Sequence, residues 1–111
     1  MKDFTPLRAF DNREFLHSRE ARAIRIMSEY MEPEKRFKDL DIKHTVVFFG
    51  SARIDPDNDI HGTAHYYNAA SDLAFELASL STEIESETGS PIYICTGGGP
   101  GIMEAANMGA Q

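Results

Sequence analysis

The sequence has few of the features that mark secreted, membrane or nucleic-acid-binding proteins. It contains one cysteine, Cys95, which cannot form an internal disulfide and suits a reducing compartment. It has no apolar run of about 18 residues, and its first residues lack the apolar core of a secretion signal. We therefore expect a cytoplasmic protein with no membrane-spanning segment.

Positive charge is scarce in the second part of the chain. Residues 1–43 carry ten Lys or Arg against nine Asp or Glu, whereas residues 44–111 carry only Arg53 against nine acids. Binding to nucleic acid needs a basic surface that displaces counterions from the phosphates. This acidic body, in a chain of net charge −7, argues against a nucleic-acid partner.

Residues 1–43 are predicted to form an N-terminal arm and a helical extension. Asp11 and Glu14 stand three positions apart, as in a capping box, and predict a helix that begins near Asp11. Apolar residues then recur at helical spacing as far as Met31, and Pro33 predicts either the end of this helix or the start of a further short turn.

Residues 44–111 are predicted to form a strand, a helix, a strand and a final helix, which is an α/β pattern. The apolar run 45–49 predicts a strand buried on both faces of a parallel sheet, and residues 92–95 predict a second strand. A long helix is expected over residues 63–88, ended by Gly89. Its apolar stripe comprises Tyr66, Ala70, Leu73, Leu77, Leu80 and Ile84.

The predicted sheet is small, because two parallel strands alone do not make a stable sheet. The last helix, expected from Pro100 to Gln111, shows no terminating signal. We expect the chain to be the N-terminal part of a larger α/β fold, or to need a partner that completes its sheet.

A glycine-rich segment connects the second strand to the last helix and reads Thr96-Gly97-Gly98-Gly99-Pro100-Gly101. Three adjacent glycines cost chain entropy, so a plain turn explains them poorly. Backbone N–H groups beside the positive end of a helix suit a phosphate. The segment therefore predicts a phosphate or nucleotide site at Thr96, Gly97, Gly98, Gly99 and Gly101.

The glycine spacing departs from the two best-known nucleotide motifs. Ile102 stands where the dinucleotide fingerprint needs its third glycine, and no Lys-Ser or Lys-Thr pair follows as in a P-loop. A nicotinamide-dependent dehydrogenase and a P-loop ATPase are both disfavoured, and no cofactor is expected. No metal site is expected either, because Ile60 replaces the glycine that a calcium loop beginning at Asp55 requires.

A second turn, Gly50-Ser51-Ala52-Arg53, follows the first predicted strand. Ligands of open α/β sheets bind at the carboxyl ends of strands. Gly50 would allow close backbone approach, the Ser51 hydroxyl could donate to an anion, and Arg53 could pair with it. The alternative is a solvated turn with a surface arginine.

Two polar residues of the last helix are further candidates. Glu104 lies in its first turn, where it either favours the helix dipole or contacts a sugar hydroxyl or backbone amide. A direct contact with phosphate is disfavoured, because two negative groups repel. Asn107, one turn later, could orient Glu104 or the glycine segment.

The segments Phe49–Arg53 and Thr96–Asn107, separated by a long helix, resemble the LOG family of Rossmann-like proteins. The resemblance covers about residues 11–111. It implies a Rossmann-like three-layer fold with a parallel sheet, incomplete in this chain, in a homodimer or higher oligomer. By position, Gly50 and Ser51 would line the nucleotide site, the glycines would hold its phosphate, and Glu104 would support their loop.

The activity implied by the resemblance is that of a phosphoribohydrolase. Such an enzyme hydrolyses the N-glycosidic bond of a nucleoside 5′-monophosphate, such as AMP or a cytokinin ribotide, to the base and ribose 5-phosphate. Two alternatives stay open. One is a non-catalytic nucleotide sensor or carrier with the same fold, and the other is a truncated interaction module that binds a partner through the basic helix of residues 11–31.

We predict that the 111-residue polypeptide alone does not hydrolyse AMP. The second motif of the family, P-G-G-x-G-T-x-x-E, and a downstream catalytic arginine are not in this sequence. Glycosidic cleavage needs an activated water and stabilisation of an oxocarbenium-like sugar, which Glu104 alone supplies poorly. Purified protein incubated with AMP should release no adenine above background, and turnover at an enzyme-like rate would contradict the prediction.

Overall fold

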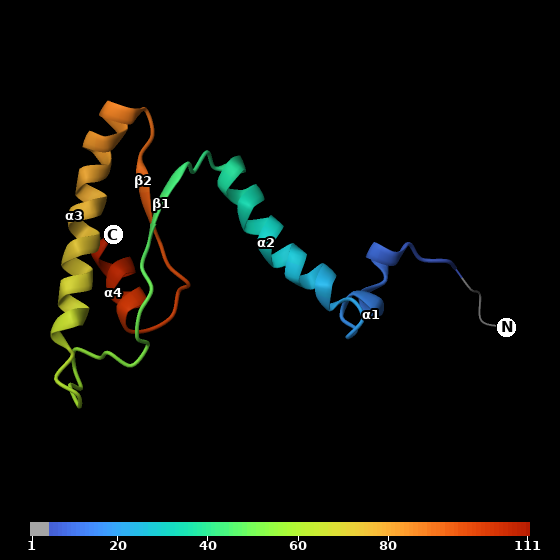
Figure 1. Cartoon of the computed structure of the whole chain (residues 1–111), viewed down its shortest axis with the longest axis horizontal. Coiled ribbons are helices and arrows are strands. Elements are labelled where there is room, and N and C mark those ends of the chain that lie inside the picture. Colours follow the sequence, from blue (N-terminus) through green and yellow to red (C-terminus); the bar gives the residue numbers. More distant parts are fainter. Residues whose placement is uncertain (1–4) are drawn as a thin grey trace. The chain divides into compact units, whose positions relative to one another are not determined.

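The computed structural model describes residues 5–111 and divides the chain into two compact units, Met1–Leu40 and Asp41–Gln111 (Figure 1). The N-terminal unit contains a short 3-10 helix η1 (Ala9–Asp11) and the α-helices α1 (Arg13–Leu16) and α2 (Arg22–Asp39). The C-terminal unit contains β1 (His44–Val47), α3 (His65–Thr88), β2 (Ile92–Cys95) and α4 (Ile102–Gly109).

The prediction of one helix beginning at Asp11 is wrong, because the chain turns between α1 and α2. Asn12 caps α1 in place of Asp11, and its side-chain oxygen accepts a hydrogen bond from the Phe15 N–H at 3.1 Å. The Arg25 guanidinium, on α2, donates to the carbonyl oxygens of Leu16 and Ser18 at 2.7 and 2.6 Å. These bonds satisfy carbonyls that a continuous helix would have used for itself.

The prediction that Pro33 ends the N-terminal helix or begins a further short turn is also wrong, because α2 continues through Pro33 to Asp39. The turns around and after the proline carry ion pairs at i,i+4 spacing, which favour a helix. The pairs are Glu32 with Arg36, Glu34 with Lys38 and Lys35 with Asp39. All are exposed, so each contributes only about 0.3–0.5 kcal/mol.

β1 and β2 form a parallel pair in which His44 lies opposite Ile92 and Val47 lies opposite Cys95. The mixed α/β class and the parallel pairing of the two predicted strands are therefore confirmed. α3 connects the strands, and both α3 and α4 contact β2 (Figure 1). No helix within residues 5–111 has both the length and the apolar character that crossing a bilayer requires.

Burial of β1 on both faces, as predicted for the run 45–49, is wrong. Val46 and Phe48 are half-buried, whereas Val47 is 67% and Phe49 is 87% exposed. This alternation is that of a sheet with one covered face. Tyr93 of β2 is also exposed, so an apolar sheet surface remains uncovered among the described residues.

α3 begins at His65, close to the predicted start, and ends at Thr88. Gly89 follows as the C-cap residue with a φ of 82°, which confirms the predicted glycine stop. Its predicted apolar stripe is only partly right. Ala70, Leu77 and Ile84 are half-buried, but the other three members are exposed. Those exposed members are Tyr66, Leu73 and Leu80.

Small residues explain the difference, because they bring α3 and α4 close together. Ala74 on α3 and Ala105 and Ala106 on α4 are fully buried. A Cβ atom added to Gly109 would overlap the carbonyl oxygen of Ser71. The contact face of α3 therefore follows its smallest side chains and not its largest apolar ones.

We predict that Gly109→Ala destabilises the protein by about 1–3 kcal/mol, because the new methyl group would force α3 and α4 apart. Urea unfolding measures this change. Gly97→Ala is the matched control, since its Cβ would meet only the Met103 sulfur at an ordinary 3.4 Å. A Gly109→Ala variant as stable as the parent, as helix propensity alone would favour, would contradict the packing of these helices.

Candidate functional site

The candidate site centres on the segment Thr96–Gly101, here called the glycine bend, which leads from β2 into α4. Gly98 and Gly101 have φ angles of 76° and 75°, a region that residues with a Cβ atom rarely adopt. Gly101 is buried, and a Cβ atom there would overlap the carbonyl oxygen of Ser51. Backbone conformation therefore favours glycine at both positions, and at Gly101 the contact with Ser51 also requires it.

The start of α4 differs from the prediction. The helix begins at Ile102, so Pro100 lies in the bend and not in the first helical turn. Gly101 is the N-cap residue, with a backbone conformation outside the helical region and no side chain to cap with. The positive φ of Gly101 delays the helix by two residues.

The structure brings the two predicted turns together at the carboxyl ends of the parallel strands. The Ile102 N–H donates to the Ser51 carbonyl oxygen at 3.1 Å. A Cβ atom on Gly50 would lie 2.8 Å from the Cβ atom of Ile102. Gly50 and Ser51 thus contact the front of α4, beside the glycine bend.

Arg53 lies elsewhere. Its backbone N–H donates to the Ser51 hydroxyl oxygen at 3.2 Å, but its side chain lines a separate hollow of about 260 Å³. Asp55 and Asp59 line the same hollow. The arginine is not among the residues that line the hollow at the glycine bend.

Thr96 and Asn107 form a relay of two hydrogen bonds across the glycine bend. The Thr96 hydroxyl accepts from the Gly98 N–H at 3.1 Å and donates to the Asn107 side-chain oxygen at 3.1 Å. Of the two roles considered for Asn107, the contact that forms is with the glycine segment. The Gly98 N–H is consequently occupied by the protein itself and does not face an anion in this conformation.

Other amides at the front of α4 stay free. No residue within 5–111 accepts a hydrogen bond from the N–H of Gly99, Met103 or Glu104. Those of Met103 and Glu104, in the first turn of α4, carry the positive end of the helix dipole. Gly99 and Glu104, but not Met103, also line a hollow of about 340 Å³. Its other lining residues are Gly98, Pro100, Asn107, Met108 and Gln111.

Glu104 separates this hollow from a second one of about 260 Å³, which is lined also by Asp55, Asp57 and Tyr67. The Tyr67 hydroxyl donates to Glu104 Oε1 at 3.3 Å. Partial burial, followed by the negative charge of Glu104, raises the pKa of the Tyr67 hydroxyl. Tyr67 was not predicted as a site residue, because it precedes Glu104 by 37 positions and only the fold joins them.

The electrostatics of the site are one-sided. The residues lining the hollow at the glycine bend include Glu104 but no Lys or Arg. A phosphate there would be held by backbone N–H groups and the helix end alone. In the part of the chain that the structure describes, no group of three or more His, Cys, Asp or Glu side chains is placed to hold a metal ion.

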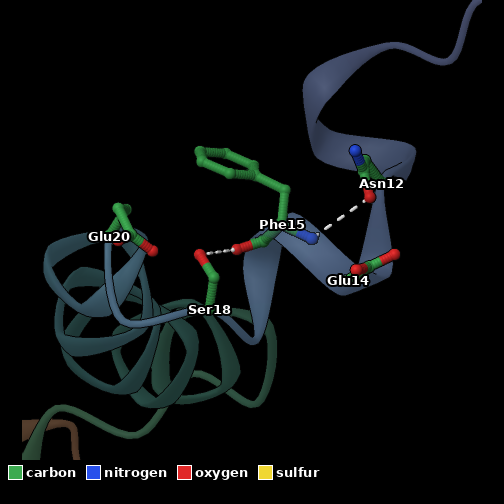
Figure 2. Close-up of a pocket in the computed structure, with 5 residues that line it drawn as sticks. All are labelled: Asn12, Glu14, Phe15, Ser18 and Glu20. Atoms are coloured by element: carbon green, nitrogen blue, oxygen red, sulfur yellow. Dashed lines mark hydrogen bonds between the residues drawn. The ribbon is translucent and has the colours of Figure 1, made fainter.

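The N-terminal unit has a hollow of its own, of about 430 Å³, lined by Asn12, Glu14, Phe15, Ser18 and Glu20 (Figure 2). The side-chain oxygens of Asn12 and Ser18 are already bonded to the backbone of Phe15, as Figure 2 shows. The two carboxylates that remain are exposed and have no opposing group in the hollow. This hollow therefore offers no arrangement for chemistry.

Comparison of the chain with protein-family models, with characterised proteins and with solved structures finds no match.

We predict that Glu104→Gln lowers the pKa of Tyr67 toward its ordinary value of about 10. The substitution removes the negative charge that opposes formation of the tyrosinate. In the parent protein, the folded state holds the Tyr67 hydroxyl proton more tightly than the unfolded state does. The free energy of unfolding of the parent should therefore fall as pH rises through the raised pKa.

Ultraviolet absorbance of tyrosinate during an alkaline titration measures this pKa, and Tyr67→Phe identifies which of the four tyrosine signals belongs to Tyr67. Identical titration curves for the parent and Glu104→Gln would show that the two side chains do not interact.

Proposed function

We propose that this chain binds the phosphate of a nucleoside 5′-monophosphate at its glycine bend. The observation that carries the proposal is the free N–H groups of Gly99 and Glu104, two residues that line an open hollow between the glycine bend and α4. The N–H of Met103, next to Glu104 in the first turn of α4, is free as well. The hollow's volume of about 340 Å³ is roughly ten times that of one liquid water molecule, so an anion has room. Amides at a helix start are a common phosphate ligand.

The nucleoside part of the ligand is proposed to lie near Glu104. A carboxylate beside a phosphate site is suited to accept hydrogen bonds from sugar hydroxyls and unsuited to touch the phosphate. The hydrogen bond from Tyr67 holds one of its oxygens. Asp55 and Asp57, across the second hollow, disfavour a further phosphate there, which supports a monophosphate as the ligand.

The wider proposal follows the resemblance to the LOG family. We infer a Rossmann-like three-layer fold of which this chain supplies part, in a cytoplasmic homodimer or higher oligomer that belongs to a nucleoside-monophosphate phosphoribohydrolase. The uncovered apolar surface of the sheet at Val47, Phe49 and Tyr93 supports a fold completed by further structure. No catalytic residue is assigned in this chain.

The interaction-module alternative is favoured by one feature, the apolar surface of α2. Several large apolar or aromatic side chains of this helix are more than half exposed. They include Ile26, Met27, Tyr30 and Met31. A partner-binding role for α2 is compatible with a nucleotide site in the other unit. The sensor or carrier alternative shares the site and differs only in catalysis.

We predict weak binding of AMP, with a dissociation constant of about 1 mM, because two or three hydrogen bonds to a charged group act without a cation. Gly98→Asp should lower the affinity by about tenfold or more, since a carboxylate would stand beside the hollow. Isothermal titration calorimetry measures both.

Gly98→Asn is the matched control. Asn has the shape of Asp without its charge, and both residues tolerate the positive φ of Gly98, where the structure leaves open space for a side chain. Binding should survive in the Asn variant and not in the Asp variant. Equal binding by the parent and both variants would place the ligand elsewhere, and no binding by the parent would end the proposal.

A further inference from the structure

We propose that Asn107 is a positioning residue for the anion site. Through the Thr96 hydroxyl it fixes the Gly98 amide, and so holds the glycine bend in the form that leaves the N–H groups of Gly99, Met103 and Glu104 free. The inference rests on the proposed function, because it assigns a role within that same site.

The direction of each hydrogen bond follows from the chemistry of the groups. A threonine hydroxyl carries one proton, and an amide N–H can only donate. Because the Thr96 oxygen accepts from Gly98, its own proton is free to go to the Asn107 side-chain oxygen. Asn107 therefore fixes the rotation of the Thr96 hydroxyl. The hydroxyl oxygen in turn fixes the direction of the Gly98 N–H.

The relay joins the two ends of the bend. Thr96 directly follows β2, whereas Asn107 lies on α4, one helical turn beyond Met103. Met103 itself lies under the bend, since a Cβ atom on Gly97 would meet its sulfur at 3.4 Å. A shift of α4 relative to β2 would therefore break the relay before it broke the helix.

Apart from the hydrogen bond to Thr96, few contacts fix the conformation of Gly98. Nothing lies within 4 Å of the Cβ position at Gly98, and the bond to Thr96 is the hydrogen bond that its N–H makes among the described residues. Glycine loses more conformational freedom on ordering than any other residue. Without the relay, the bend would sample many conformations, and the anion would have to order it on binding.

Two matched pairs of variants test the proposal. Thr96→Val keeps the shape but removes the hydroxyl, whereas Thr96→Ser keeps the hydroxyl. Asn107→Ala removes the acceptor, whereas Asn107→Asp keeps an acceptor oxygen for Thr96. Hydrogen exchange of the Gly98 amide, followed by NMR without any ligand, should accelerate in Thr96→Val and Asn107→Ala and stay unchanged in the two conservative variants.

Calorimetry with inorganic phosphate supplies the second readout. Thr96→Val and Asn107→Ala should each weaken phosphate binding by about tenfold, the effect of freeing one ordered residue. Thr96→Ser should retain the parent affinity. This rescue separates positioning from general stability, and urea unfolding verifies that every variant is folded; where one is not, the other member of the disruptive pair carries the test.

The positioning role of Asn107 and the anion site are contradicted by different results. Parent-like Gly98 exchange in both disruptive variants, or phosphate affinity that does not change in them while the parent binds, would overturn the role of Asn107. Absence of phosphate binding by the parent would overturn the proposed function and the anion-binding part of this inference together. The exchange rates would then still show whether the relay orders the bend.

Discussion

The contact between the Ser51 turn and the start of α4 is the constraint on which the candidate site depends. One of the first N–H groups of α4 donates to the Ser51 carbonyl oxygen, and Gly101 lets the two backbones meet with no side chain between them. This contact joins segments that follow two neighbouring parallel strands. It holds the N-terminus of α4 at the carboxyl edge of the sheet, where α/β proteins commonly bind ligands.

Once α4 is held there, its remaining amides define what the site can do. The Ile102 and Gly98 N–H groups are used by the protein, so an anion could reach only the amides around them. The surroundings are acidic, with Glu104 at the hollow and two aspartates beyond it. A site of this kind favours one phosphate with hydroxyl donors attached over a polyanion, because each further negative charge meets a carboxylate.

Part of this arrangement could be predicted from the sequence, and the successes share a local cause. The strands, the long helix and its Gly89 stop follow from apolar runs and one glycine, and the approach of Gly50 and Ser51 to the bend follows from the parallel strand order. The failures depend on what lies nearby in space. Burial of residues 45–49 on both faces would require a second layer over the sheet. The face of α3 that contacts α4 is determined by small residues, to which hydrophobic periodicity gives little weight. Tyr67 was missed because its partner Glu104 is distant in sequence. For Asn107 the sequence left two partners open, and only the fold shows that it contacts Thr96 of the glycine bend.

The central claim is that free amides at the glycine bend bind a phosphoryl group. The most direct measurement is an NMR titration of the amide signals of the ¹⁵N-labelled chain with AMP. We expect saturable shifts concentrated at Gly99, Met103 and Glu104, with signals of α2 unchanged. Shifts that avoid the glycine bend, or no shifts at all, would contradict it.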